Sequence, residues 1–327
     1  MTYYESYKSV IEALSHAGVR HGRRVDIRHL EADDFRFQGL EDELGPCDGI
    51  LVPGGFGDRG YEQMLEVIRY ARESGKPFFG ICFGLQLAIV EYARNVLGLP
   101  HASSEELRSP MDPPGEDFIY FMSSWYNYKT ARIVYRKRDS SIGGTMRLGL
   151  QPCFLNPGTK AFAAYSSAWS EGKRRAQRSP SYAYDEVPLT HSPSFYRTAF
   201  NQEIDPKTLA DLEKDAREKG LLTVYERHRH RYEINPAYHG VLTAGPAGGG
   251  DRFLVSGEAP KFTVPEQNAP PHIVEIMELE RHPWFLGCQF HPEFLSRPLR
   301  PHPLFQDFVR AAADYRDGRK GKTQAGS

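Results

Sequence analysis

The chain has 327 residues, 40% of them hydrophobic, and a formal net charge of −1. This composition predicts one large globular domain and argues against a surface devoted as a whole to nucleic acid or to a membrane. The four cysteines, Cys47, Cys82, Cys153 and Cys288, have the spacing of neither a metal site nor a disulfide framework. Because there is also no membrane-length apolar run and no signal peptide, we expect a cytoplasmic protein with reduced thiols and no metal.

Helices and strands are predicted to alternate along the first half of the chain. Gly18 and Gly75 are expected to end the two helices, whose apolar residues recur at helical spacing. This alternation predicts an α/β fold of three layers, in which a mostly parallel sheet has helices on both faces and the chemistry lies at the carboxyl ends of the strands. Shorter antiparallel additions are expected from about residue 131. The predicted helices span residues 6–17 and 61–74, and the predicted strands residues 24–30 and 50–53.

A cysteine lies in a tight turn between a predicted strand and a predicted helix. Cys82 stands between Gly80 and Gly84, after the apolar residues 77–79 and before apolar residues at helical spacing. This is the thiol version of a nucleophile elbow, in which the helix N-terminus favours a thiolate and side chains at the two glycines would collide with neighbouring strands. The alternative is a buried cysteine beside an ordinary turn.

A histidine and a glutamate follow another apolar strand near the end of the chain. The strand predicted over residues 285–290 runs directly into His291-Pro292-Glu293. A thiolate nucleophile needs an imidazole to exchange protons, and the imidazole needs a carboxylate to orient it. With one proline between them, both groups can leave the strand end on the same side. Taken alone, such a pair is more typical of solvent-exposed side chains without a catalytic role.

A glycine-rich loop follows the strand predicted at residues 50–53. Its sequence, Pro-Gly-Gly-Phe-Gly at residues 53–57, leaves backbone N–H groups open to close approach, so they could bind a tetrahedral oxyanion. The loop has neither the glycine spacing of a dinucleotide fingerprint nor the ending of a phosphate loop. An ordinary glycine-rich turn is the alternative.

Together these motifs resemble the class I glutamine amidotransferases, which carry Pro-Gly-Gly-Phe-Gly, Gly-Ile-Cys-Phe-Gly-Leu-Gln and Phe-His-Pro-Glu in this order. Two more specific stretches, Gly-Gly-Thr-Met-Arg-Leu-Gly at residues 143–149 and Glu-Arg-His-Arg-His-Arg-Tyr-Glu at residues 226–233, resemble the glutaminase domain of CTP synthases. The similarity covers roughly residues 3–154 and 221–315. Without the other motifs, the basic run in the second stretch would indicate a solvated strand or a nucleic-acid patch.

The resemblance implies a role for each matching residue. Cys82 would be the nucleophile, His291 the general base and acid, and Glu293 the group that orients it. Glu106 would bind the α-ammonium of glutamine and Arg229 its α-carboxylate, the pairing of charges that an amino acid demands; Glu105 remains the alternative to Glu106. The N–H groups of Gly55 and Phe83 would bind the oxyanion, and the substrate contacts would be Gly55, Phe83, Gly84, Leu85, Gln86, Glu106 and Arg229.

The resemblance also implies an activity. L-Glutamine would be hydrolysed to glutamate and ammonia through a thioester on Cys82, and the ammonia would serve amination of UTP to CTP by a synthetase (amidoligase) domain absent from this chain. ATP, Mg²⁺ and UTP would belong to that domain, no cofactor to this one, and GTP would act as an allosteric activator near a lid at residues 143–149. The full-length protein is implied to be a homo-oligomer, with no nucleic-acid or membrane partner. A free-standing γ-glutamyl hydrolase or peptidase and a catalytically idle regulatory domain remain alternatives.

The domain organisation follows from the same comparison. We expect an amidotransferase domain over residues 1–315, mobile insertions at 157–200 and 245–271, and a polar disordered tail at 316–327. Asp205, Pro206 and Gly220 bracket a capped helix predicted at residues 209–219. The resemblance also implies an apolar first strand that nothing before Ser6 could form, so we expect unpaired sheet backbone.

Overall fold

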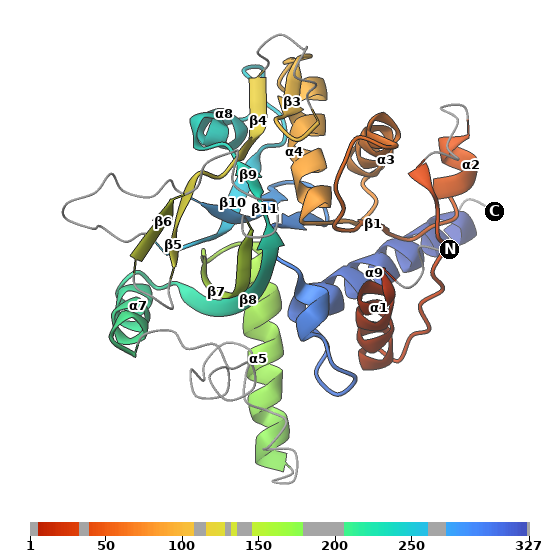
Figure 1. The fold of residues 1–327 in the computed structure, drawn as a ribbon. Helices are drawn as coiled ribbons and strands as arrows, with labels where there is room; N and C mark the ends of the chain where they lie inside the picture. Colours follow the sequence, from red (N-terminus) through yellow and green to blue (C-terminus); the bar gives the residue numbers. More distant parts are fainter. Residues whose placement is uncertain are drawn as a thin grey trace.

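The computed structural model describes residues 6–32, 39–107, 116–127, 132–135, 146–178, 206–260 and 273–325. A seven-stranded sheet forms the centre of this part of the chain (Figure 1). In spatial order its strands are β1 (Ile50–Val52), β2 (Phe78–Ile81), β12 (Phe285–Cys288), β11 (Val274–Leu279), β10 (Phe253–Glu258), β7 (Arg147–Leu155) and β8 (Leu222–His230).

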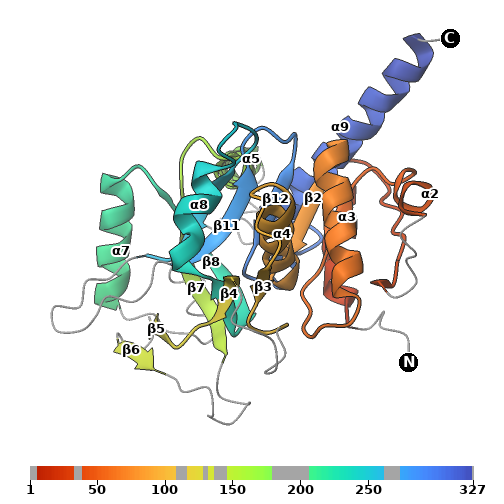
Figure 2. The ribbon, with the colours of Figure 1, turned by 90° about the horizontal axis from the view of Figure 1, so that it is seen from above.

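Helices cover the central sheet on both faces, with α3 and α4 on one side and α1, α5 and α9 on the other (Figures 1 and 2). Two small sheets flank the centre, one of β3 (Ala102–Ser104), β4 (Glu116–Phe121) and β9 (Tyr232–Ile234), the other of β5 (Ser124–Asn127) and β6 (Arg132–Tyr135). The helices are α1 (Lys8–Arg20), α2 (Leu40–Leu44), α3 (Tyr61–Ser74), α4 (Phe83–Asn95), α5 (Lys160–Arg178), α7 (Pro206–Glu218), α8 (His239–Ala244) and α9 (Pro303–Ala325), and the 3-10 turns are η5 (Pro236–Tyr238) and η6 (Pro292–Leu295).

Within the central sheet, parallel pairing is confined to the three strands that carry the sequence motifs, and outside it β3 and β4 also pair in parallel. Strand β2 pairs in parallel with β1 on one side and with β12 on the other, whereas β11, β10, β7 and β8 are joined by antiparallel ladders. The predicted α/β fold is confirmed, and so are the antiparallel additions in the later part of the chain. Ile81 and Cys288, the last residues of β2 and β12, are register partners, so the segments that follow them leave the sheet at the same edge.

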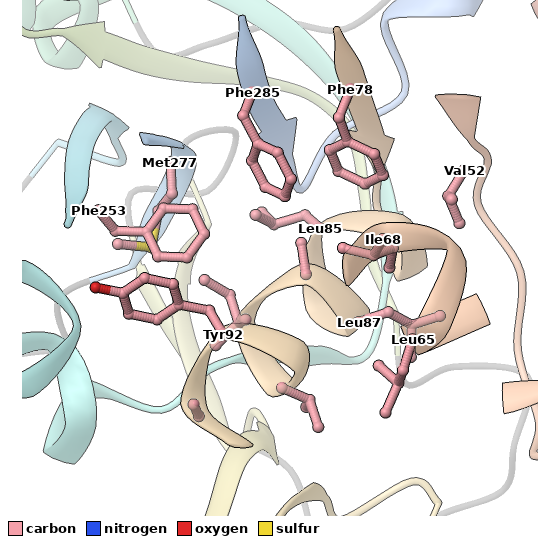
Figure 3. Close-up of a cluster of buried hydrophobic side chains, with 14 of the residues drawn as sticks. Val52, Leu65, Ile68, Phe78, Leu85, Leu87, Tyr92, Phe253, Met277 and Phe285 are labelled. Carbon is pink, nitrogen blue, oxygen red and sulfur yellow. The ribbon is translucent and has the colours of Figure 1, made fainter. Parts of the chain in front are cut away.

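Alternating side chains of the parallel strands build two hydrophobic layers. Phe78 of β2 stacks on Phe285 of β12, with ring centroids 4.4 Å apart, on the face that α3 and α4 cover (Figure 3). Phe79 points to the opposite face and meets Trp284 and Phe305 edge to face. All of these rings are buried, and each contributes about 1.5–3 kcal/mol by leaving water. The sheet edge that bears the motifs is therefore held from both sides.

Most predicted helices are confirmed, and one glycine has a different function from the one predicted. Helix α3 has the predicted bounds, and Gly75 ends it in the left-handed conformation at φ 69°. Helix α1, in contrast, continues through Gly18 to Arg20. A Cβ at Gly18 would lie 2.7 Å from the carbonyl oxygen of Arg23, so this glycine lets the returning chain approach the helix and does not stop it.

The strand predicted at residues 24–30 is wrong, since these residues join no ladder. Val25 and Ile27 are partly buried against the cluster beneath α1 and α9. The alternation of apolar residues therefore indicates that one side of an extended segment is buried. Such burial does not require the segment to pair with a strand. In the described sheet, β1 has one strand neighbour, β2.

The predicted mobile insertions contain regular structure. Residues 160–178 form α5, whose first turn is capped by Thr159 Oγ1 and by the buried carboxylate of Glu278, which accepts the N–H groups of Lys160 and Ala161. Residues 253–258 form β10, a central strand. The prediction of mobile loops is therefore wrong for residues 160–178 and 253–258. It relied on polar composition, which does not exclude an amphipathic helix or a strand. Residues 179–205 and 261–272 lie outside the described residues.

The predicted disordered tail is also wrong for residues 316–325, which continue α9. Asp317 pairs with Arg23 at 3.1 Å, and Arg319 donates to the Gly45 carbonyl at 2.8 Å, so two contacts hold the polar end of the helix. The helix predicted at residues 209–219 is confirmed as α7, although Asp205 lies outside the described residues.

Candidate active site

Cys82 occupies a strained turn between β2 and α4. Its φ of 51° makes it the only residue other than glycine with a positive φ in the described ranges. The side chain is 7% exposed. The Cys82 N–H donates to the Cys288 carbonyl at 2.7 Å, and this hydrogen bond ties the elbow to the end of β12. The backbone is thus fixed on the sheet side while the thiol lies at the helix N-terminus.

The two elbow glycines leave no room for side chains. A Cβ at Gly84 would overlap the carbonyl oxygen of Val52 in β1, which is the collision with a neighbouring strand that the sequence predicts. A Cβ at Gly80 would instead lie 2.7 Å from the carbonyl carbon of Gly84, within the first turn of the elbow's own helix. A side chain at Gly84 would therefore push α4 away from β1, and a side chain at Gly80 would push it away from β2.

His291 is the residue just before the 3-10 turn η6, beyond the end of β12, and Glu293 lies within that turn. The imidazole Nδ1 is 2.7 Å from Glu293 Oε1, which leaves Nε2 for the hydrogen bond between the ring and Cys82. Burial opposes the charged imidazolium, but the hydrogen bonds to Cys82 and Glu293 outweigh it and raise the pKa of His291 to about 10. The three side chains form a continuous chain from thiol to carboxylate.

Two further contacts orient the imidazole. The His291 ring stacks on Phe294, with centroids 5.5 Å apart and an interplanar angle of 25°. The backbone N–H of His291 donates to the Arg227 carbonyl at 2.8 Å, and this hydrogen bond joins the turn to strand β8. Phe294 was not identified from the sequence, although its place three residues after the histidine in a tight turn favours such a contact.

The glycine-rich loop after β1 packs directly on the thiol and the imidazole. A Cβ at Gly54 would lie 2.7 Å from His291 Cε1 and 3.6 Å from the Cys82 Cβ. A Cβ at Gly55 would touch the Phe83 ring at 3.4 Å, so the two residues expected to supply oxyanion donors are neighbours. Phe83 is the first residue of α4, where backbone N–H groups have no partner within the helix. The side chain of Phe56, 89% exposed, projects from this loop.

The two candidate acids after β3 have different surroundings. Glu105 Oε2 accepts the Phe121 N–H at 2.8 Å, so this carboxylate holds two strands together. Glu106 is half-buried and accepts a hydrogen bond from the backbone of Gly57, in the glycine-rich loop. Burial raises the pKa of Glu106, while the Gly57 bond and the charge of Arg231 act in the opposite direction. Of the two acids, Glu106 is the one beside the loop.

The arginines of the stretch at residues 226–233 alternate with the histidines, and Arg229 and Arg231 have different surroundings. Arg229, the residue expected to hold the substrate carboxylate, is exposed and pairs with Leu148 in the ladder. Arg231 lies just beyond the strand. Of these two arginines, Arg231 is the one whose charge acts on the pKa of Glu106.

The remaining expected substrate contacts lie in the first turn of α4. Gly84, Leu85 and Gln86 are buried, and Leu85 packs against Gly287, so Gly84 and Leu85 can offer backbone atoms only. Gln86 Nε2 donates to the Tyr232 carbonyl at 3.1 Å and to Gln289 Oε1 at 3.2 Å. The amide nitrogen of Gln86 is therefore committed to the protein. Gln289, which the sequence did not single out, donates to Cys82 Sγ at 3.5 Å.

A buried polar cluster lies beside the catalytic segment, where the His228 ring meets Phe290, and it contains residues of both specific sequence stretches. Arg147, 1% exposed, contacts Glu275 Oε1 at 2.5 Å and lies 3.6 Å from Glu233 Oε1. His228 and His230 complete the cluster, with His228 Nδ1 2.8 Å from His230 Nε2. Burial lowers the pKa of each histidine far below its usual value. The lid predicted at residues 143–149 is therefore wrong for residues 147–149, which belong to β7; residues 143–145 lie outside the described residues.

Two features are absent from the described residues, a metal-binding cluster and a membrane-spanning helix. No group of three or more histidine, cysteine, aspartate or glutamate side chains within them is arranged to hold a metal ion. None of the helices in the described ranges combines the length and the apolar character that crossing a bilayer requires.

Known proteins match this chain along nearly its whole length. The model of the family "Glutamine amidotransferase class-I" matches residues 2–311. The CTP synthase of Nitratidesulfovibrio vulgaris is 39% identical over 320 residues, which are 97% of this chain and 45% of that protein. The CTP synthase of Pelotomaculum thermopropionicum is 40% identical over 316 residues, 96% of this chain and 43% of that protein. This chain thus spans less than half the length of the curated relatives that it matches.

A solved structure agrees with these matches. The glutaminase domain of the Trypanosoma brucei CTPS, solved with bound acivicin, superposes with a TM-score of 0.65 at 26% sequence identity. The match covers 95% of this chain and 89% of that one.

Proposed function

This chain belongs to the class-I glutamine amidotransferases, as its motifs predicted, and from that premise we propose that it hydrolyses L-glutamine through a thioester on Cys82. The observation that carries the proposal is the hydrogen-bonded chain from Cys82 through His291 to Glu293 at one edge of the sheet. A positioned thiol, base and orienting carboxylate are what acyl transfer to sulfur requires.

In the first half of the reaction, the sulfur of Cys82 attacks the side-chain amide carbon of glutamine. Because the pKa of His291 is raised to about 10, the imidazole carries its second proton at neutral pH. The proposed attacking species is the thiolate, the nucleophilic form of cysteine. The tetrahedral oxyanion would be stabilised by the N–H groups of Gly55 and Phe83. Collapse of this intermediate breaks the C–N bond, and the leaving nitrogen takes the proton from His291 to depart as ammonia.

In the second half, water hydrolyses the thioester. Neutral His291 removes a proton from the water, whose oxygen attacks the acyl carbon. The C–S bond then breaks and releases glutamate, and Cys82 and His291 regain their starting protonation. Glu293 accepts a hydrogen bond from the ring nitrogen Nδ1 throughout, which fixes the tautomer and stabilises the imidazolium.

Substrate recognition is assigned to opposite charges on either side of the amino-acid head group. Glu106, beside the loop at residues 53–57, is proposed to bind the α-ammonium. An arginine of the 226–233 stretch is proposed to bind the α-carboxylate, either Arg229 by family correspondence or Arg231 by its proximity to Glu106. The backbone of Gly84 and Leu85 and the side-chain oxygen of Gln86 complete the proposed contacts.

The destination of the ammonia is proposed from the relatives. Because the chain aligns with proteins named CTP synthase, we propose that a synthetase domain uses the ammonia to aminate UTP, with ATP and Mg²⁺ bound there and GTP as an activator. A cytoplasmic location and assembly of the full-length protein into a homo-oligomer belong to the same proposal.

The test is to measure glutamate and ammonia released from L-glutamine by this chain, alone and mixed with the synthetase domain of a relative plus UTP, ATP and Mg²⁺. We expect hydrolysis that Cys82→Ala abolishes, and CTP formation in the mixture. Hydrolysis without any CTP would favour a free-standing hydrolase, and no turnover in either arm would favour an idle regulatory domain. Unchanged turnover by Cys82→Ala would contradict the thioester mechanism.

A further inference from the structure

Gln289 lies between the proposed nucleophile and the first turn of α4. Its side chain is fully buried, with Nε2 3.5 Å from Cys82 Sγ and Oε1 3.2 Å from Gln86 Nε2. Its backbone N–H donates to the Glu275 carbonyl at 2.8 Å. None of the roles assigned above uses this residue.

Strand register explains why Gln289 is there. Ile81 and Cys288, the last residues of the parallel strands β2 and β12, are register partners. The next residue on each chain is therefore Cys82 on one side and Gln289 on the other, and both leave the sheet at the same level. The sequence order Cys-Gln-Phe-His thus puts an amide beside the sulfur before the chain reaches the catalytic histidine.

The hydrogen bonds determine which end of the Gln289 amide faces the sulfur. The Tyr232 carbonyl can only accept, so the group of Gln86 that lies 3.1 Å from it must be the amide NH₂. The same NH₂ lies 3.2 Å from the Gln289 side chain, which must present its oxygen there. The NH₂ of Gln289 is consequently the end that points to Cys82 Sγ.

We propose that Gln289 is a further catalytic residue of the proposed glutaminase reaction, in which its amide N–H donates to the Cys82 sulfur and stabilises the thiolate. The inference rests on the proposed function and deepens it. His291 also hydrogen-bonds the sulfur, but it gives its proton to the departing ammonia. Gln289 cannot give up its proton, so it remains a donor when the thiolate is expelled again during thioester hydrolysis. Gln86 takes part indirectly, by holding the Gln289 amide in this orientation.

The proposal is tested without substrate, by the pH dependence of Cys82 alkylation with iodoacetamide in the full chain. Gln289→Met keeps the volume and loses the donor, and we expect the midpoint of the alkylation profile to rise by about one pH unit. Gln289→Glu replaces the donor by a carboxylate and is expected to raise the midpoint further. The matched control is Gln306→Glu, where the lost amide donates to the Pro301 carbonyl, away from the site; its midpoint should equal that of the wild type.

A variant-free measurement covers the case in which Gln289 variants do not fold. In the wild-type chain, the side-chain amide resonances of Gln289 should shift with the same midpoint as Cys82 alkylation, since the donor senses the charge on its acceptor. An unchanged alkylation midpoint in a folded Gln289→Met variant, or an amide resonance that does not titrate with the thiol, would overturn the proposal. If the wild-type chain shows these shifts but hydrolyses no glutamine, the proposed function fails while the contact between Gln289 and Cys82 stands.

Discussion

Gly54 packs against His291 so closely that a Cβ at position 54 would lie 2.7 Å from the imidazole Cε1. Real Cβ atoms do not approach other atoms this closely, so the loop or the imidazole would have to move. The glycine-rich loop after β1 is thereby part of the wall that holds the catalytic ring, besides offering backbone N–H groups.

A Gly54→Ala substitution should therefore lower glutaminase kcat/KM by about 10²-fold, because a displacement of about 1 Å is enough to misalign a catalytic base. The unfolding midpoint should change little. Gly240→Ala is the control, since a Cβ there meets nothing within 4 Å and alanine favours the helix α8. Wild-type kinetics in Gly54→Ala would show that the imidazole does not depend on this contact.

A glutamine-like chloroketone should label Cys82 in preference to the other three cysteines. Burial raises the pKa of Cys153 and of Cys288 far above its usual value, so both remain thiols. Cys47 is more exposed than Cys82 but lies outside the site, with its sulfur directed to the Glu43 carbonyl. Peptide mapping by mass spectrometry gives the distribution, and predominant labelling of Cys47 would remove the nucleophile assignment.

Replacement of the base should cost more than replacement of the group that orients it. We expect His291→Ala to reduce turnover by about 10² to 10⁴-fold and Glu293→Gln to reduce it less. Because the hydrogen bond to Glu293 helps to raise the pKa of His291, the Glu293→Gln variant should lose activity at a lower pH on the alkaline limb than the wild type. The measurement is the pH profile of kcat/KM for both proteins. If the alkaline limb does not move in Glu293→Gln, the hydrogen bond to Glu293 does not contribute to the pKa of His291.

The acid beside the loop should govern substrate affinity, and its neighbour should not. Glu106→Gln is expected to raise the KM for glutamine by about tenfold or more, because a charge-assisted hydrogen bond to the ammonium is lost. Glu105→Ala should leave KM unchanged and cost about 1 kcal/mol of unfolding free energy, since the Phe121 N–H loses its acceptor. The opposite pattern in steady-state kinetics would exchange the roles of the two acids.

The same assay compares the two arginines. If proximity to Glu106 decides which one binds the carboxylate, Arg231→Ala should raise the KM more than Arg229→Ala does. A larger effect of Arg229→Ala would restore the assignment made by family correspondence.

The buried carboxyl of Glu233 should make stability depend on pH. Burial and the neighbouring Glu275 raise its pKa well above the unfolded value, while Arg147 opposes the shift. A group of this kind contributes stability that is complete below its unfolded pKa, near 4.5, and is lost as the pH rises toward its folded pKa. Glu233→Gln mimics the protonated acid. The free energy of unfolding of the variant should therefore increase relative to that of the wild type as the pH rises above about 4.5.

Urea unfolding at several pH values measures this difference. Glu280→Gln is the control of opposite sign, because the hydrogen bond from Arg252 lowers the pKa of Glu280 on the surface. A pH-independent difference for Glu233→Gln would mean that this carboxyl has the same protonation in the folded and unfolded chain.

Local sequence patterns determined the elements that carry the chemistry. Gly80, Cys82 and Gly84 indicated an elbow, because glycines on both sides of a potential nucleophile between a strand and a helix are typical of that turn, and the structure leaves no room for a Cβ at either glycine. The apolar stripe and Gly75 gave the bounds of α3, and His291-Pro292-Glu293 put base and carboxylate in one short turn. Each of these features is recorded in a short stretch of sequence, although the clash that requires Gly84 is with Val52 of β1.

Tertiary structure decided what depends on strand order and register. Gln289 and Cys82 are 207 positions apart and meet because two parallel strands end level. Arg147 is buried against Glu275 of β11, and the charge of Arg231, which lies between β8 and β9, acts on Glu106 in the turn after β3. The polar residues of α5 and α9 are helical because distant partners, Glu278, Arg23 and Gly45, hold them. The sequence contains these residues, but the free energy that pairs them arises from long-range packing, which no local pattern records.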